Sequence, residues 1–334
     1  MPTTHSPGRG RDREPAPRDR EPAPRGDAPT SRGDAPAPRR GPSGGPSALM
    51  LGPAMLIFAG FALLPMIGVV VLSFTRWDGL GSPTFAALDN WRTLGRDSLL
   101  PKAALLSVLV MALSWLIQTP VSLLLGVFVA GRARYRAVLG ACCFLPLLLS
   151  SAAISIIWRN LLDPTFGLVA NVSEQPHLGW LDQPWLGDER LALLTVTFVL
   201  SWQYIPFHVL LYQAGTRQIP VSMFESATLD GAGRLQQFRY ITLPQLRHTI
   251  VSSTTLILIG SLTSFDIVFV LTGGGPGDAT RILPLHMYLT GFVRYDMGEA
   301  SAIAVVLLLG GLLVSTTLVR ASGFGSMQST QAGL

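Results

Sequence analysis

Long apolar runs alternate with short polar segments along most of the chain. A helix needs about 20 apolar residues to cross the hydrocarbon core of a bilayer. The runs of suitable length are Ala48–Phe74, Ala103–Ala130, Val138–Trp158, Leu191–Gln213, Thr249–Leu271 and Glu299–Arg320. The pattern therefore predicts an all-α, polytopic membrane protein with six transmembrane helices.

Several of these runs contain a proline, at Pro65, Pro120, Pro146 and Pro206. Proline lacks a backbone N–H and clashes with the preceding helical turn. Within a span it kinks the helix or frees backbone groups that line a cavity. A kink that only improves packing remains an equally good interpretation for each proline taken singly.

The connections between the runs indicate the orientation. Arginines crowd the connections after the second and fourth runs, at Arg132, Arg134, Arg136, Arg217, Arg234, Arg239 and Arg247. Short basic loops stay on the cytoplasmic side of a membrane. Both connections and both chain ends are therefore predicted to be cytoplasmic. The outer loops are then Thr75–Lys102, Arg159–Arg190 and Thr272–Gly298.

The pattern also divides the chain into a membrane domain, 48–320, and two tails. Residues 1–47 are rich in Arg and Pro, and repeat RDREPAP from Arg11 and Arg18. Such a segment has little to bury, so we expect a disordered cytoplasmic tail. A cleaved signal peptide is the alternative, but Ala48–Phe74 is longer than the apolar region of a signal peptide. Residues 321–334 form a short cytoplasmic tail.

Composition supports a membrane protein, because 49% of the residues are hydrophobic and only 13% are charged. The net charge of +5 does not predict nucleic-acid binding, since the arginines lie in the tail and in short loops. Cys142 and Cys143 are adjacent in an apolar run, and no Cys/His spacing typical of a metal site is present. We expect neither a metal nor a cofactor.

Enzyme motifs are absent as well. The only lysine is Lys102, and no phosphate-binding GxxxxGK[ST] loop precedes it. The sequence also has no HExxH motif. We therefore expect a protein without catalytic residues of its own.

A short amphipathic segment, about 217–247, separates the fourth and fifth runs. Pro220 suits the first turn of a helix from Val221 to about Leu229, and Gly231 suits the turn that ends it. A second helix is predicted from about Gly233 to Ile241. Its apolar stripe, with polar residues on the other side, predicts a hairpin that docks on another protein. Docking on lipid headgroups is the weaker alternative, because basic residues do not dominate its polar face.

Polar residues inside the spans are candidates for a solute pathway. Asp266 lies late in the fifth run, two residues after Ser264, and Gln203 and Tyr204 lie together in the fourth. Each has a structural alternative: Asp266 could cap the following loop, and Tyr204 could be a packing residue. His208 is better interpreted as a packed histidine than as a proton relay.

The hairpin carries a known pattern: Glu225-Ser-Ala227, then Gly231, then Ile241-Thr-Leu-Pro244. It resembles the EAA loop of bacterial ABC importer permeases. The segment Phe265–Gly277 with its TGGGP sequence, and Tyr295-Asp-Met-Gly298, are similar to the carbohydrate-type permeases of the MalF/UgpA-like group. Ser226 replaces an alanine of the family pattern, and His248 stands where a second proline is frequent. The resemblance covers about Ala48 to Arg320.

The resemblance implies the type I ABC importer fold in the bacterial inner membrane. It implies as partners a second, dissimilar permease, two cytoplasmic ATP-binding subunits, an extracytoplasmic solute-binding protein and membrane lipid. The coupling residues that it implies are Glu225, Ser226, Ala227, Asp230, Gly231, Phe238, Ile241, Leu243 and Pro244. The solute would be a sugar or a related polyol. The alternative function is an ion-coupled secondary transporter without an ATPase, in which Asp266 would be the key residue.

Overall fold

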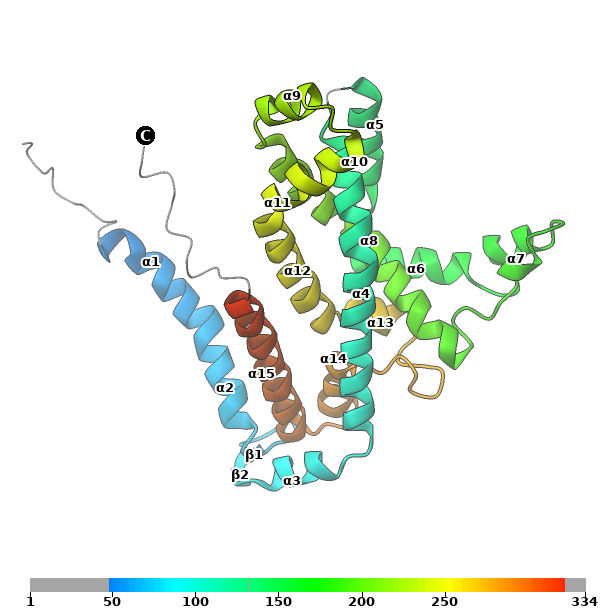
Figure 1. The fold of residues 1–334 in the computed structure, drawn as a ribbon. Coiled ribbons are helices and arrows are strands. Elements are labelled where there is room, and N and C mark those ends of the chain that lie inside the picture. Colours follow the sequence, from blue (N-terminus) through cyan, green and yellow to red (C-terminus); the bar gives the residue numbers. More distant parts are fainter. Residues whose placement is uncertain (1–47, 132, 322–334) are drawn as a thin grey trace, which may run out of the picture. The chain divides into compact units, whose positions relative to one another are not determined.

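The computed structural model describes residues 48–131 and 133–321, and these are almost entirely helical (Figure 1). The predictions for residues 1–47, for Arg132 and for residues 322–334 lie outside the described residues. Contacts divide the chain into a unit that ends at Ala54 and a unit from Met55 to Leu334. The described part of the first unit is the beginning of α1 (Ala48–Phe58).

Within the described ranges, four helical stretches are long and apolar enough to cross a membrane. The first, Leu51–Leu72, joins most of α1 to a π-helical stretch (Ala59–Leu63) and α2 (Leu64–Leu72). The others are α4 (Leu99–Val129), α8 (Glu189–Arg217) and nearly all of α15 (Met297–Ala321). They confirm the first, second, fourth and sixth predicted spans as continuous helices.

The third predicted span is interrupted, which corrects the expectation of one continuous helix. Its parts are α5 (Arg134–Cys143), a 3₁₀ turn (Leu145–Leu148) and α6 (Ser151–Leu161), with a bend of 98°. Pro146 lies in the turn, and Leu149 and Ser150 are extended. The Ser150 hydroxyl accepts from the Ala153 N–H at 3.2 Å and caps the new helix.

The fifth predicted span is also broken. Here α12 (Arg247–Leu262) ends after 16 residues, short of a full crossing, and α13 (Asp266–Leu271) begins after Phe265. The hydroxyl of Thr263 donates to the Ile259 carbonyl at 3.0 Å. Hydroxyl side chains that bond the backbone in this way compete with the helix and favour its end.

The predicted effect of proline depends on its position. Pro120 and Pro206 lie inside continuous helices, and Pro65 is the second residue of α2. Only Pro146 lies at a break between helices. The other prolines are therefore accommodated within their spans.

The core of the larger unit is built around α4, which packs along α8 and α12. One stripe of α4 is buried at intervals of three or four residues, at Ala103, Ser107, Val110, Ser114, Gln118, Ser122, Gly126 and Val129. Most of these side chains are small, so the helices approach closely, as is usual in membrane proteins.

Shorter elements lie at the ends of the larger unit. The strands β1 (Thr75–Arg76) and β2 (Thr84–Phe85) pair antiparallel and precede α3 (Asp89–Arg96). At the opposite end lie α9 (Val221–Leu229) and α10 (Arg234–Gln237), near the start of α5 (Figure 1). The two basic connections therefore lie at one end, as predicted.

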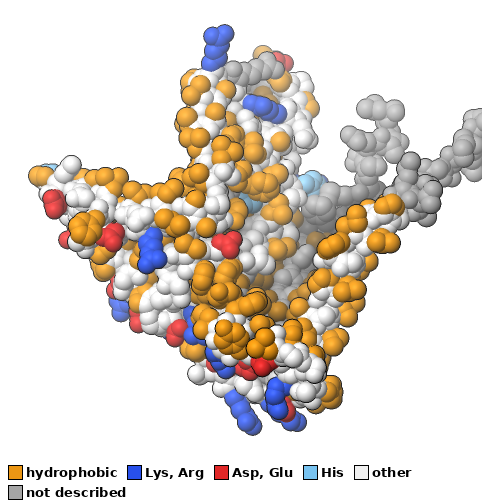
Figure 2. All heavy atoms as spheres, turned by 180° about the vertical axis from the view of Figure 1, so that it is seen from behind, with side chains coloured by type: hydrophobic (Ala, Val, Ile, Leu, Met, Phe, Trp, Pro, Cys, Tyr) orange, Lys and Arg blue, Asp and Glu red, His pale blue; other side chains and the backbone are white. Residues whose placement is uncertain are grey.

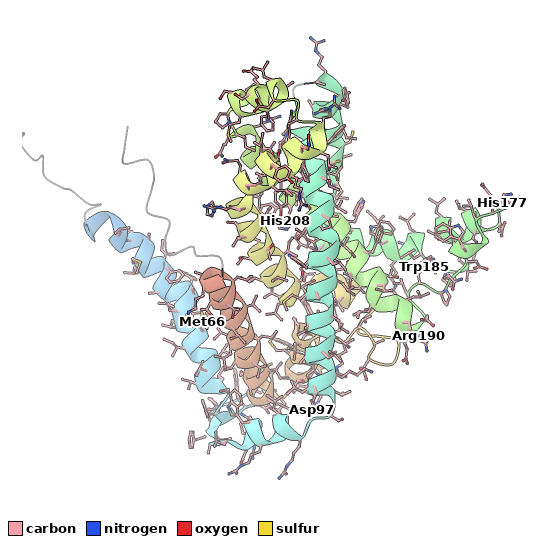
Figure 3. The ribbon with its side chains drawn as sticks, viewed as in Figure 1. Met66, Asp97, His177, Trp185, Arg190 and His208 are labelled. Atoms are coloured by element: carbon pink, nitrogen blue, oxygen red, sulfur yellow. The ribbon has the colours of Figure 1, made fainter. Side chains whose placement is uncertain are left out.

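Two further segments contain short elements. An arm containing α7 (Leu168–Ser173) and a 3₁₀ turn (Gly179–Leu181) extends away from the helices; Figure 3 labels His177 and Trp185 on it. A second segment returns beside α4 and comprises α14 (Leu283–Tyr288) and a π-helical stretch (Leu289–Val293). Figure 2 shows hydrophobic side chains over most of the visible face, with most charged ones toward its margins.

Candidate functional site

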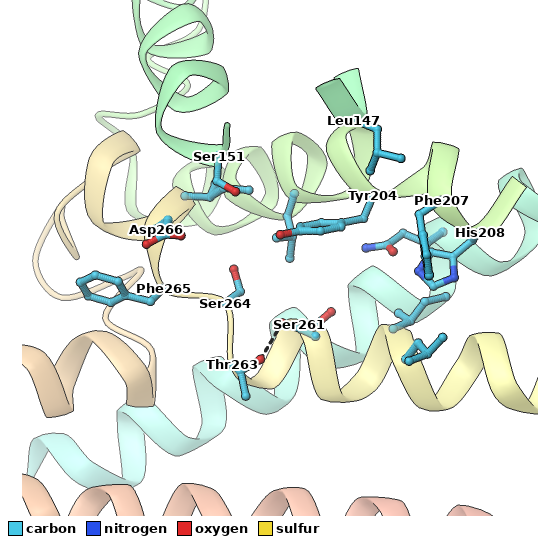
Figure 4. A pocket seen from close by; sticks show the side chains of 16 residues that line it. Leu147, Ser151, Tyr204, Phe207, His208, Ser261, Thr263, Ser264, Phe265 and Asp266 are labelled. Carbon is cyan, nitrogen blue, oxygen red and sulfur yellow. Dashed lines mark hydrogen bonds between the residues drawn. The ribbon is translucent and has the colours of Figure 1, made fainter. Parts of the chain in front are cut away.

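A cavity of about 370 Å³ lies between α4, α8 and α12 (Figure 4). The side chains that line it come from five helices and the segments between them. They are Gln118, Leu147, Ser151, Leu200, Tyr204, Phe207, His208, Leu256, Ile257, Gly260, Ser261, Thr263, Ser264, Phe265, Asp266 and Ile267. The cavity is the leading candidate for a solute site among the described residues.

The cavity forms where both interrupted spans break. Leu147 and Ser151 flank the break between α5 and α6, and Thr263 to Asp266 make up the break between α12 and α13. Irregular backbone at membrane depth is tolerated where it is buried in protein or lines a polar cavity. The breaks in the two spans therefore explain why polar side chains lie in this part of the chain.

Three of the four predicted pathway residues line the cavity: Tyr204, Ser264 and Asp266 (Figure 4). The fourth, Gln203, does not line the cavity but bonds a side chain that does. Its amide nitrogen donates to the Ser151 hydroxyl at 3.1 Å, while its own oxygen is buried without a partner. Gln203 is thus placed to hold Ser151 in position.

The carboxylate of Asp266 is exposed in the cavity at the first residue of α13. It makes no hydrogen bond or ion pair within the described part of the chain. The capping interpretation of this residue therefore has no side-chain bond to support it. The carboxylate is free to accept hydrogen bonds from a solute.

Sequence reasoning missed other lining residues. Gln118 of α4 lines the cavity and donates to the Ser201 hydroxyl at 3.4 Å. His208 lines it too, although its ring is largely buried. The regular polar stripe along α4 was a signal for Gln118, because polar residues inside spans face the interior of a bundle.

His208 also joins two helices. Its Nδ1 lies 2.9 Å from the hydroxyl of Ser253 on α12, and its ring packs edge-on against Phe207 at 5.2 Å. The prediction of a packed histidine is therefore correct, and the His208 ring also lines the cavity.

The lining of the cavity suits a polar solute that is not an anion. Tyr204, Phe207 and Phe265 offer aromatic faces, while hydroxyls and one carboxylate offer hydrogen bonds. No lysine or arginine is among its lining residues, which all lie in the described ranges. Rings beside hydrogen-bonding groups suit a molecule with both apolar and hydroxylated faces.

The second candidate site is the hairpin between α8 and α12. α9 and α10 have the predicted turn between them, and Gly231 has φ of 79°, which favours glycine. A π-helical stretch (Phe238–Thr242) and α11 (Leu243–Gln245) complete the connection to α12. The Gln237 amide donates to the Thr228 hydroxyl at 3.1 Å and to the Ala232 carbonyl at 3.0 Å, so the two helices are tied together.

The hairpin surface is apolar and open. Leu229, Leu235 and Tyr240 are 89%, 79% and 71% exposed. Of the residues implied by the resemblance, Glu225, Ser226, Asp230, Gly231 and Pro244 are exposed, whereas Ala227, Phe238, Ile241 and Leu243 are half-buried. The predicted apolar stripe consists of Leu235, Phe238 and Ile241, and it is divided: Leu235 is exposed, whereas Phe238 and Ile241 are half-buried.

Comparison with known proteins identifies the family. The family model described as the inner membrane component of binding-protein-dependent transport systems matches residues 122–323. The chain belongs to this family. The region of the match includes both interrupted spans, the hairpin and every cavity-lining residue except Gln118.

Individual proteins agree with this assignment. The chain is 33% identical to the probable ABC transporter permease protein YurN of Bacillus subtilis, over 80% of this chain and 92% of YurN. It is 30% identical to the arabinooligosaccharides transport system permease protein AraP of the same organism, over 82% and 88%. A solved bacterial alginate ABC transporter, crystallised with an alginate pentasaccharide-bound periplasmic protein, has the same fold, with a TM-score of 0.72 and 21% identity over 85% of this chain and 96% of the other.

The predicted resemblance is thereby confirmed. The chain is a multi-pass membrane permease of the ABC transporter type, a component of a binding-protein-dependent system. This assignment favours the predicted function over the ion-coupled alternative.

Proposed function

We propose that this permease imports a carbohydrate across the bacterial inner membrane, driven by ATP that separate subunits hydrolyse. The observation that carries the solute class is the cavity between the broken spans, with aromatic faces beside hydroxyls and a carboxylate. A relative named for arabinooligosaccharide transport supports the same class. Tyr204, Ser264 and Asp266 contact the solute in this proposal, and Gln203 positions Ser151.

The hairpin is the coupling element of the proposal. Its coupling residues are Glu225, Ser226, Ala227, Asp230, Gly231, Phe238, Ile241, Leu243 and Pro244. The exposed apolar side chains of α9 and α10 would be covered by an ATP-binding subunit, and Glu225 would pair with a basic residue there. Movement of that subunit then changes which side of the membrane the cavity faces.

The assembly needs further subunits. We infer a second, dissimilar permease and two ATP-binding subunits, with a solute-binding protein on the outer side. The family's dependence on a binding protein supports the last of these. The apolar and exposed outer sides of α2 and α15 suit contact with lipid or with the second permease.

The membrane topology is part of the proposal. Counting the two interrupted spans as crossings gives six, with both chain ends in the cytoplasm, a cytoplasmic tail over residues 1–47 and another over residues 321–334. The hairpin and the connection from α4 to α5 lie at one end of the helices, which supports a common cytoplasmic side.

Affinity purification of the tagged protein from its native membrane, followed by mass spectrometry, tests the assembly. We expect a second permease, an ATP-binding protein and a solute-binding protein to be recovered together. Recovery of the permease alone after gentle solubilisation would contradict the proposal. The recovered binding protein then gives a direct assay for sugars.

A further inference from the structure

The two ring nitrogens of His208 have different surroundings. Its Nδ1 lies 2.9 Å from the hydroxyl of Ser253 on α12. Its Nε2 makes no hydrogen bond within residues 48–131 and 133–321. Yet Nε2 is not one of the fully enclosed polar atoms that lack a partner, a group that includes the Tyr212 hydroxyl. His208 is only 3% exposed and lines the cavity, so the open space that Nε2 reaches is the cavity.

The bond to Ser253 determines which nitrogen carries the proton. Ser253 is fully buried, and the Tyr212 hydroxyl faces it without a formed hydrogen bond. If the serine accepted a proton from Nδ1–H, it would donate its own to Tyr212, whose enclosed proton would then have no acceptor. If Ser253 donates to Nδ1 instead, the Tyr212 proton can turn to the serine oxygen and no buried donor is left unpaired. His208 is therefore a neutral ring with its proton on Nε2, directed into the cavity.

The cavity thus has a hydrogen-bond donor and an acceptor on different walls. His208 and Asp266 lie on opposite sides of the view in Figure 4, with Tyr204 between them. The Asp266 carboxylate accepts, whereas Nε2–H donates. A hydroxyl group does both, so a molecule with several hydroxyls can pair with the two walls at once. A quaternary ammonium would suit the rings and the carboxylate, but it would leave Nε2–H without an acceptor.

We propose that His208 contacts the solute, with Nε2–H donating a hydrogen bond to a hydroxyl or ring oxygen of the carbohydrate. Ser253 is a positioning residue, because its hydroxyl holds the imidazole in one orientation and one tautomer. This role rests on the proposed function, since the oxygen that accepts the bond belongs to the carbohydrate. The same ring therefore joins α8 to α12 and contacts the solute.

Two substitutions of His208 separate the contact with the solute from the contact with Ser253. In His208→Gln the longer amide reaches the position of Nε2, so a donor remains toward the cavity while the bond to Ser253 is lost. In His208→Asn the shorter amide reaches only the position of Nδ1, so its oxygen accepts from Ser253 while the donor is lost. Each variant keeps the half of the imidazole that the other removes.

Uptake of radiolabelled maltose and arabinobiose by cells that carry the complete native transporter compares the variants. We expect His208→Asn to lower the maximal uptake rate about fivefold, the equivalent of one neutral hydrogen bond, and His208→Gln to retain most of it. Immunoblotting of the membranes corrects the rates for the amount of permease. His177→Asn, at an exposed position on the arm, is the control for the same exchange away from the cavity.

The outcomes are distinguishable. Retained uptake in His208→Asn together with loss in His208→Gln would show that only the bond to Ser253 matters, and would overturn the solute contact. Equal rates in the two variants, at wild-type amounts of permease, would overturn it as well, while the sugar function stands. If wild type transports neither sugar although it transports another solute class, the carbohydrate function is wrong and the solute contact falls with it.

If either variant is missing from the membrane, labelling of the purified wild-type transporter decides. Diethylpyrocarbonate modifies neutral imidazole rings, and mass spectrometry of peptides gives the extent of modification at each histidine. A saturating concentration of the transported sugar should slow the modification of His208 but not that of His177. Equal modification of His208 with and without the sugar would overturn the contact.

Discussion

At Gly126 the backbones of α4 and α8 approach so closely that no side chain fits between them. A Cβ atom there would lie 2.6 Å from the Tyr212 Cβ and 2.9 Å from the Val209 carbonyl oxygen. The close approach also brings Gln118 and Ser122 of α4 against α8, where Gln118 bonds Ser201. One glycine thus determines the packing that forms a wall of the cavity.

The substitution Gly126→Ala should therefore destabilise the permease. Overpacking of this kind costs about 1–3 kcal/mol, so we expect a lower Tm for the purified complex in detergent. Gly68→Ala is the matched control, because a Cβ at Gly68 has nothing within 4 Å. Equal Tm values for the two variants would contradict the packing described here.

A second prediction for a single residue concerns the carboxylate of Asp266. It stands in the cavity without a partner among the described residues, so Asp266→Asn should weaken hydrogen bonding to a solute without disturbing the fold. We expect uptake to fall about tenfold, with unchanged amounts of the permease in the membrane. Asp182→Asn, an exposed position on the arm, is the control. Uptake equal to wild type in Asp266→Asn would remove this residue from the pathway.

Among the elements, α3, α4 and α14 are joined by a chain of charged and polar side chains at the end of the helices opposite α9. The Nε2 of His286 lies 2.8 Å from Asp97, which Figure 3 labels near the start of α4, and its Nδ1 accepts from Arg281 at 3.1 Å. Arg281 in turn pairs with Asp278 at 3.1 Å. Neutral His286 satisfies both contacts, with Nε2–H donating to the carboxylate.

The pKa values of this pair predict the response to acid. Burial lowers the pKa of His286 below 6.5, and Arg281 lowers it further, against the opposing effect of Asp97. Burial opposes ionisation of Asp97, but the Leu99 N–H and His286 outweigh it and hold its pKa below 3.8. Arg294 contributes to both shifts.

Stability should therefore fall as the solution is acidified. Below pH 6.5 an unfolded His286 takes up a proton that the folded one resists, so the unfolded state binds more protons. The contribution of Asp97 is lost only at lower pH, through its lowered pKa. Between about pH 7.5 and about pH 5.5, the Tm of wild type should drop more than that of His286→Gln. Parallel curves for the two proteins would contradict the assignment of a neutral His286.

A substitution in the hairpin tests its proposed coupling role. Glu225 is exposed on α9, so Glu225→Lys should leave folding and membrane insertion intact, since exposed substitutions usually change stability by no more than about 0.5 kcal/mol. We expect uptake to be lost because the charge of the docking surface is reversed. Glu174→Lys, exposed on the arm, controls for charge reversal as such. Normal uptake in Glu225→Lys would contradict the docking role.

The helices and their breaks indicate which features of the fold the sequence could predict and which it could not. Pro220 and Gly231 are local signals, and the bounds of α9 followed from them directly. The breaks at Ser150 and Thr263 were missed because a hydropathy average over about 20 residues hides two or three polar ones. Their meeting at one cavity, and the bond of His208 to Ser253, depend on tertiary packing between distant segments, which no local pattern reports.

For the whole molecule, the account joins a cavity at two broken spans to a hairpin at one end of the helices. Each part lies in the unit that begins at Met55. The chain belongs to the family of binding-protein-dependent transport components. The central claim is the proposal that ATP hydrolysed by another subunit drives transport and that the hairpin transmits this energy to the cavity.

The most direct measurement is solute uptake by the purified complete transporter in proteoliposomes, with ATP inside and the binding protein loaded with arabinotetraose or maltotetraose outside. The account predicts accumulation that requires ATP, is insensitive to an uncoupler and is absent with Glu225→Lys. Accumulation without ATP that collapses on addition of an uncoupler would contradict it.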